Sequence, residues 1–208
     1  MRFGVFDHLD KTGAPSETIY RERLDLVEAY DRAGFYAFHI AEHHGSPLGL
    51  APSPSVFLGA VAARTSRLRF GPLVYTLPLY EPLRLIEEIG MLDQMSGGRL
   101  EIGVGRGIVA FETAFFGLTH LDTPPRFEEA LDILLTAFRS ETLTYDGRFW
   151  TYRNVPMEIP PLQRPHPPLW YGVGRPDHGG ARHEHRRQRR GRADPADLRG
   201  LPGSRRPG

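Results

Sequence analysis

Short apolar runs alternate with longer segments whose apolar residues recur at helical spacing along residues 1–175. Short runs rich in aromatic and β-branched residues indicate strands, whereas apolar residues three and four positions apart indicate helices. The pattern predicts strands at residues 2–6, 35–40, 68–75, 100–104 and 168–173. It predicts helices within residues 16–33, 53–65, 82–95 and 127–138. An insertion at residues 142–163 follows the last helix, and its Asp146-Gly147 pair is typical of a hairpin turn.

Strands and helices in alternation predict parallel α/β structure, which is either doubly wound or a closed barrel. The predicted strands follow one another without a long return connection, which favours a TIM-type (β/α) barrel. A barrel of this type has eight strand–helix units in about 250 residues, and this chain supplies about five of them. We therefore expect an incomplete barrel domain over residues 1–175.

Residues 176–208 differ in composition from the rest of the chain. They hold nine arginines and four acidic residues, so that 17 of the 26 basic and 21 of the 25 acidic residues belong to residues 1–175. A segment with so few large apolar residues cannot bury enough surface to offset its ordering entropy. We expect a disordered, basic Arg/Gly/Pro-rich tail. It is either an out-of-frame ending of a truncated or frame-shifted barrel, or a natural tail that binds RNA or acidic surfaces.

The composition excludes several kinds of site and location. The chain has no cysteine, so disulfides, thiolate metal sites and cysteine nucleophiles are excluded. No run approaches the roughly eighteen apolar residues of a membrane span. The amino terminus leads directly into a strand pattern without a signal peptide. A cytoplasmic protein without membrane contact is expected, and nucleic acid is not an expected partner of residues 1–175.

Three predicted strands end in polar residues or glycines. Glu42-His43-His44 follows the second strand, Gly71-Pro72-Leu73-Val74 lies in the third, and Gly103-Val104-Gly105-Arg106-Gly107 closes the fourth. The carboxyl ends of parallel strands meet at one edge, so these segments should converge on one rim, where barrel enzymes hold their ligands. A metal site is not expected there. Adjacent residues on a strand point to opposite faces, and no helical His-Glu-x-x-His spacing is present.

In this order and spacing the segments resemble a known family, the bacterial luciferase-like flavin-dependent monooxygenases. The residues that carry the resemblance are Phe3-Gly4, Glu42-His43-His44, the run Leu92-Asp93-Gln94-Met95-Ser96-Gly97-Gly98-Arg99, and residues 103–107. The resemblance covers roughly residues 1–175 and implies a TIM-type barrel with a flavin at its carboxyl-end rim. It implies an enzyme that uses reduced FMN and O2 to oxygenate a small organic substrate. It further implies a separate flavin reductase and a homodimeric assembly.

The resemblance also assigns roles to residues of the rim. His43 occupies the position of an acid/base histidine, and imidazole suits that role because it exchanges protons near neutral pH. Arg106 is expected to reach the flavin phosphate, and Leu73-Val74 corresponds to a non-proline cis peptide bond beneath the isoalloxazine ring. Gly105 stands where the luciferases carry a cysteine, which argues against light emission. The expected cofactor contacts are Leu73, Val74, Gly105, Arg106, Glu112 and Gly174, and the expected substrate contacts are Phe6, Glu42 and His44.

Each assignment has an alternative. His43 and His44 are otherwise hydrogen-bonded structural histidines, Phe6 is core packing, and Arg106 pairs with Glu112 rather than with a phosphate. The GxGxG spacing of residues 103–107 fits a dinucleotide-binding fingerprint poorly. For the whole chain, the second enzyme hypothesis is a deazaflavin-dependent dehydrogenase on the same fold. FMN is preferred because the Glu-His-His segment follows the luciferase pattern. The third hypothesis is a truncated product without activity.

Overall fold

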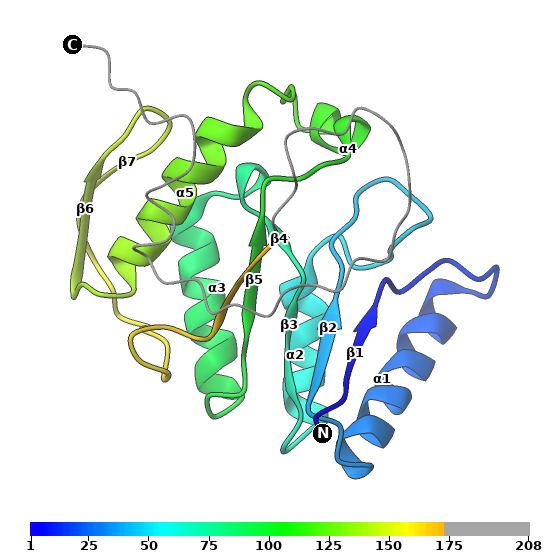
Figure 1. Ribbon diagram of the computed structural model, residues 1–208. Helices are drawn as coiled ribbons and strands as arrows, with labels where there is room; N and C mark the ends of the chain where they lie inside the picture. The colour runs from blue at the N-terminus through cyan, green and yellow to red at the C-terminus, as the bar shows by residue number, and fades with distance from the viewer. Residues whose placement is uncertain (173–208) are drawn as a thin grey trace.

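The computed structural model describes residues 1–172, in which four long helices pack against a layer of parallel strands (Figure 1). The predicted tail and Gly174 lie outside the described residues. The helices are α1 (Ser16–Arg32), α2 (Pro54–Arg64), α3 (Pro82–Met95), α4 (Ala110–Phe115) and α5 (Thr123–Ala137), with a 3-10 turn η1 (Leu77–Leu79). The strands are β1 (Gly4–Asp7), β2 (Ala37–Ile40), β3 (Arg69–Pro72), β4 (Tyr75–Thr76), β5 (Ile102–Gly105), β6 (Thr142–Asp146), β7 (Thr151–Pro156) and β8 (Leu169–Tyr171).

The parallel strands pair in the order in which they occur along the chain. β1, β2 and β3 form one sheet, and β4, β5 and β8 form a second. A parallel bridge between Phe70 of β3 and Leu100, just before β5, connects the two sheets near their amino ends. β6 and β7 form a separate antiparallel hairpin, as predicted for the insertion. The α/β class is therefore confirmed.

The third predicted strand is not continuous. The pattern predicts one strand over residues 68–75, but β3 ends at Pro72 and β4 begins at Tyr75. The Leu73–Val74 peptide bond between them is cis, as the family resemblance implies. β3 pairs with β2, whereas β4 pairs with β5. The interruption lies at the carboxyl end of the sheet, where the candidate site is expected.

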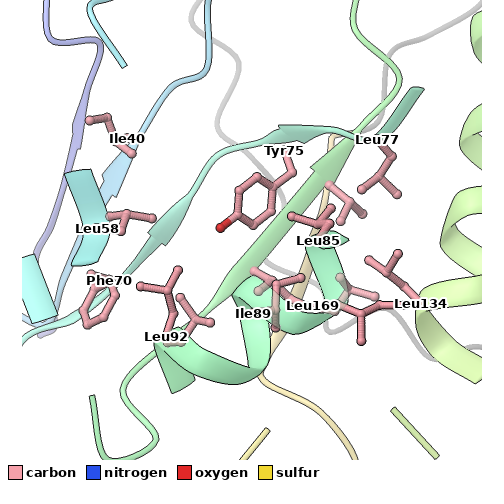
Figure 2. Packing of buried hydrophobic residues seen from close by; sticks show 14 of the residues in the cluster. Ile40, Leu58, Phe70, Tyr75, Leu77, Leu85, Ile89, Leu92, Leu134 and Leu169 are labelled. Carbon is pink, nitrogen blue, oxygen red and sulfur yellow. The ribbon is translucent and has the colours of Figure 1, made fainter. Parts of the chain in front are cut away.

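The two faces of the parallel strands carry different residues, because side chains alternate along a strand. The face toward the helices is apolar: Phe38, Ile40 and Phe70 are fully buried and pack in one cluster with α2 and α3 (Figure 2). The opposite, inner face carries glycines and polar or aromatic side chains, namely Gly4, Phe6, Ala37, His39, Arg69, Gly71, Glu101, Gly103 and Trp170. Bulky branched residues usually fill the interior of a complete barrel. The inner face here therefore leaves a hollow.

The predicted helices are confirmed, with ends that differ by a few residues. Pro82 is the first residue of α3, as expected for proline, and the Glu81 carboxylate accepts the Arg84 N–H at 2.9 Å. α4 and η1 are absent from the sequence-based prediction, because six and three residues are too short for a helical periodicity to stand out. α4 supplies Glu112 to the candidate site, and Thr76 and Tyr80, which flank η1, bond Glu42 there.

Within residues 1–172, β1 and β8 each pair along one edge only. The described strands do not close into a barrel, and the expected assignment to an incomplete TIM-type barrel stays a prediction. In this same part of the chain, no helix combines the length and the hydropathy that crossing a membrane requires.

Candidate active site

The polar segments that follow the parallel strands meet at one rim. Glu42-His43-His44 follows β2, and Glu112 belongs to α4, which follows β5. Their side chains touch, because His43 Nδ1 lies 3.0 Å from Glu112 Oε1, although the two residues are 69 positions apart in sequence. The predicted convergence of these strand ends is confirmed.

His43 and Glu112 form a hydrogen-bonded pair that is mostly shielded from water. Their side chains are 17% and 9% exposed. An ionised carboxylate only accepts hydrogen bonds, so opposite an ionised Glu112 it is Nδ1 of His43 that donates, and in the neutral imidazole Nε2 then keeps the free lone pair. A carboxylate on one nitrogen of a histidine fixes its tautomer and orientation for work at the other nitrogen.

The Glu42 carboxylate forms hydrogen bonds with other residues of the rim. Its side chain is fully buried, and it accepts hydrogen bonds from the Tyr80 hydroxyl at 2.6 Å and the Thr76 N–H at 3.3 Å. The second carboxylate oxygen lies 3.1 Å from His44 Nε2. Burial, together with the Glu42 charge, raises the pKa of Tyr80 far above its ordinary value, so the phenol stays a donor. The geometry favours a positioning role for Glu42; direct contact with a substrate stays a prediction.

The glycines of β5 are explained by contact with the cis segment. A Cβ atom on Gly103 would lie 2.6 Å from Leu73 Cδ2, and one on Gly105 would lie 2.6 Å from Val74 Cγ2. Real Cβ atoms essentially never come this close, so any side chain here would displace the cis segment. The structure thus gives both glycines a packing role, and contact of Gly105 with a cofactor stays a prediction.

The Arg106 side chain is not hydrogen-bonded to the His43–Glu112 pair. Its side chain is exposed, and it makes no hydrogen bond or ion pair with any other residue of the described range 1–172. The alternative pairing with Glu112 is wrong, because Glu112 pairs with His43. A role for Arg106 at a phosphate stays a prediction, and Gly174 lies outside the described residues.

A hollow of about 270 Å³ opens on the inner face of the sheet. Phe6, His39, Leu73, Glu101 and Trp170 are among the residues that line it. Phe6 is 46% exposed and borders this hollow instead of joining the hydrophobic core. The aromatic and aliphatic wall suits an organic ligand, whereas the polar groups are concentrated at Glu101.

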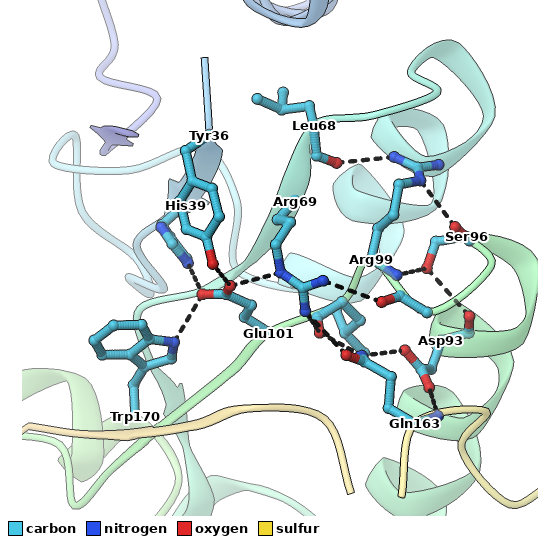
Figure 3. A network of polar contacts seen from close by, with 12 residues as sticks. Tyr36, His39, Leu68, Arg69, Asp93, Ser96, Arg99, Glu101, Gln163 and Trp170 are labelled. Carbon is cyan, nitrogen blue, oxygen red and sulfur yellow. Dashed lines mark hydrogen bonds and ion pairs between the residues drawn. The ribbon is translucent and has the colours of Figure 1, made fainter. Parts of the chain in front are cut away.

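Glu101 is the centre of a buried polar network that the sequence analysis missed (Figure 3). Its side chain is 1% exposed and accepts hydrogen bonds from Arg69 Nε at 2.7 Å and Trp170 Nε1 at 2.8 Å. His39 Nε2 lies 3.4 Å from the same carboxylate, outside hydrogen-bond geometry.

Burial raises the pKa of Glu101, but His39 and Arg69 outweigh this effect and lower the pKa from 4.5 to about 2. The carboxylate is therefore ionised at neutral pH. The signal that could have revealed the network is strand parity, because Glu101 and His39 both occupy inner-facing positions. In the part of the chain that the structure describes, no three metal-binding side chains gather into a cluster.

Comparison with known proteins identifies the family. The sequence profile described as "Luciferase-like monooxygenase" matches residues 1–179. The chain is 50% identical over 177 residues to protein y4wF of Sinorhizobium fredii, 33% identical to limonene 1,2-monooxygenase of Rhodococcus erythropolis, and 29% identical to the oxygenase component of the flavin-dependent trigonelline monooxygenase of Acinetobacter baylyi. The matches cover 85%, 66% and 85% of this chain but 52%, 36% and 50% of the relatives. The chain thus spans about half the length, or less, of these curated relatives.

Solved structures agree with this result. The monooxygenase RslO1 of Streptomyces bottropensis superposes with a TM-score of 0.79 at 30% identity, covering 82% of this chain and 53% of that one. The oxygenating constituent of 3,6-diketocamphane monooxygenase from Pseudomonas putida, a complex with FMN, superposes with a TM-score of 0.71 and covers 82% and 51%. A coenzyme F420-dependent reductase from Methanopyrus kandleri gives 0.65 and covers 83% and 50%. The last two are each 20% identical to this chain and indicate the shared fold alone. By its profile match, its relatives and its fold, this chain belongs to the luciferase-like monooxygenase family.

Proposed function

We propose that this chain forms the flavin- and substrate-binding part of a monooxygenase that uses reduced FMN and O2 to oxygenate a small organic substrate. The observation that carries the proposal is the His43–Glu112 pair, whose Nδ1 and Oε1 atoms are 3.0 Å apart at the rim. A histidine held by a carboxylate at the carboxyl ends of parallel strands is suited to proton transfer. Family membership supports the redox class of the reaction.

The residues at the rim fit a flavin. The glycines of β5 let Leu73 and Val74 lie close against that strand, so no side chain of β5 projects over the cis segment. Leu73 also lines the hollow and offers an apolar contact to a planar ring. Arg106, exposed after β5, would hold the phosphate, since guanidinium groups bind phosphate by paired hydrogen bonds. When bound, reduced FMN supplies the electrons that allow O2 to react with an organic substrate.

The role of the protein in this proposal is positioning and proton transfer. Glu112 keeps the proton on Nδ1 of His43, which leaves Nε2 to accept a proton from, or return it to, a substrate oxygen atom. The hollow beside Phe6 and Leu73 would hold the organic part of the substrate and exclude water from it. His44, fixed by Glu42, would line the same entrance.

FMN and deazaflavin are distinguished by direct binding. We expect the purified 208-residue chain to bind FMN, seen as a change in its visible absorbance, and to bind coenzyme F420 more weakly. FMN binding should weaken in Arg106→Ala, while Arg148→Ala, which removes an exposed arginine of the hairpin turn, serves as the matched control. Failure to bind FMN would contradict the proposal, and tighter binding of F420 would favour the dehydrogenase.

Turnover tests the histidine. Limonene, trigonelline and an alkanal are suitable probes with reduced FMN and O2, because relatives named for such substrates match this chain. Oxygenated product should fall by about 10²–10⁴-fold in His43→Ala, the usual contribution of acid–base catalysis. The exposed loop residue His120 provides the control, and His120→Ala should match the parent chain. Equal turnover of His43→Ala and the parent would remove His43 from the mechanism.

A further inference from the structure

A second histidine, His8, lies against the His43 ring. It follows β1, and the imidazole rings of His8 and His43 are 5.5 Å apart between centroids with an interplanar angle of 16°. On its other side, His8 meets the edge of the Phe6 ring at 4.9 Å and 64°. Aromatic rings at 4.5–7 Å in offset-stacked or edge-to-face arrangements attract one another. Phe6, His8 and His43 thus form one row of rings that ends at Glu112.

The backbone holds His8 in this place. Leu9, the next residue, is fully buried and donates its N–H to Asp7 Oδ1 at 2.9 Å. The Leu9 carbonyl accepts the Leu50 N–H at 3.0 Å, and Lys11 donates to the Pro47 carbonyl at 3.1 Å. The segment that follows His8 and the segment that follows His43 are therefore held together by two backbone hydrogen bonds.

The contacts of His43 leave one edge of its ring free. Glu112 occupies Nδ1, and His8 covers one face. Gly49 closes the region of Cβ and Cδ2, since a Cβ atom added to Gly49 would lie 3.2 Å and 3.4 Å from those atoms. Of the two ring nitrogens, Nε2 makes no hydrogen bond to residues 1–172. Rotation of the His43 ring away from Glu112 would break its stacking contact with His8.

We propose that His8 is a positioning residue for His43: it stacks on the imidazole, preserves the Nδ1–Glu112 hydrogen bond and so keeps Nε2 directed at the substrate side of the rim. This inference rests on the proposed function of His43, and it adds a residue that no rim motif contains. His8 acts through its flat ring and not through its charge. Phenylalanine should therefore replace it, and alanine should not.

The test follows the Nδ1 proton of His43 by NMR in the full 208-residue chain with ¹⁵N-labelled histidine and no flavin. His43→Gln assigns the signal. In His8→Ala, exchange of this proton with water should accelerate by about two- to twelvefold, the factor that corresponds to the loss of one aromatic pair. His8→Phe should restore the parent rate. His166, whose Nδ1 lies 2.7 Å from the Pro167 carbonyl, is the internal reference and should not change.

An unchanged exchange rate in His8→Ala would overturn the inference, and so would a His8→Phe chain that behaves like His8→Ala. If His8→Ala does not fold, His8→Leu replaces it, because leucine fills the space without a flat ring and is expected to show the accelerated exchange. In turnover, His8→Ala should lower kcat with little effect on KM, and His8→Phe should recover it. The NMR result does not depend on flavin, so a chain that binds no FMN can still confirm or contradict the role of His8.

Discussion

Removing the charge of Glu101 tests whether the inner polar network stabilises the fold. Glu101→Gln keeps the size of the side chain and one acceptor oxygen, but it replaces a carboxylate that bonds Arg69 and Trp170. The carboxyl pKa is lowered from 4.5 to about 2. Because one pKa unit corresponds to about 1.4 kcal/mol, this shift sets an upper limit of about 3 kcal/mol on the stability that the charge contributes.

The expected loss is smaller than that limit. The Arg69 side chain is 23% exposed, so water screens part of its attraction to Glu101. We expect Glu101→Gln to lower the free energy of unfolding by about 2 kcal/mol at neutral pH. The sign follows from the lowered pKa: the stabilisation is fully present above pH 4.5 and is lost as the pH falls toward about 2. The difference between the two chains should therefore shrink on acidification.

Urea unfolding, followed by far-ultraviolet circular dichroism at about pH 7 and about pH 3, measures both effects. The matched control is Glu17→Gln, which removes a carboxylate from an exposed pair with Arg21 and should cost about 0.5 kcal/mol or less. Equal losses for Glu101→Gln and Glu17→Gln would refute the reasoning. If Glu101→Gln lowers the free energy of unfolding by the same amount at both pH values, the assignment of a negative charge to Glu101 is wrong.

Two further substitutions test close packing and the guanidinium of Arg99. Gly71→Ala should destabilise the fold by more than about 3 kcal/mol, because the new Cβ would lie 1.8 Å from the Glu101 carbonyl oxygen. Gly59 lies in α2, and a Cβ atom added there would meet nothing within 4 Å, so Gly59→Ala should instead stabilise the fold by about 0.5–1 kcal/mol. Thermal unfolding of the two variants measures the difference. Arg99→Lys should cost about 2–3 kcal/mol in urea unfolding, because lysine cannot reproduce five hydrogen bonds from one planar group. Arg64→Lys, at an exposed helix end, should change little, and a similar loss in both would contradict this explanation.

The single strand predicted over residues 68–75 shows where local pattern fails. The run is rich in apolar residues and its pattern predicts one continuous strand, yet β3 and β4 belong to different sheets. The cis bond between Leu73 and Val74 has no signature in hydrophobic pattern, and only the resemblance to a family implied it. Periodicity describes which way side chains point; it carries no information on the state of a particular peptide bond.

At the rim, too, the local pattern predicted the position of the segments but not the contacts between their side chains. Polar residues and glycines after apolar runs were enough to predict that Glu42-His43-His44 and residues 103–107 share one edge. The partner of His43 was not predictable, because Glu112 lies in a six-residue helix and the sequence offers Arg106 as an equally suitable partner for Glu112. The choice between them depends on distances across the rim.

The sequence alone determined the alternation of strands and helices, the order of the strands and the edge at which polar residues gather. These properties follow from the spacing of apolar residues within single elements, which is local information. The tertiary structure decided which side chains touch: Glu112 with His43, His8 with His43, and Arg69 and Trp170 with Glu101. Such contacts join residues 32 to 69 positions apart, and they are selected by the packing of whole elements around a hollow inner face, which no local pattern encodes.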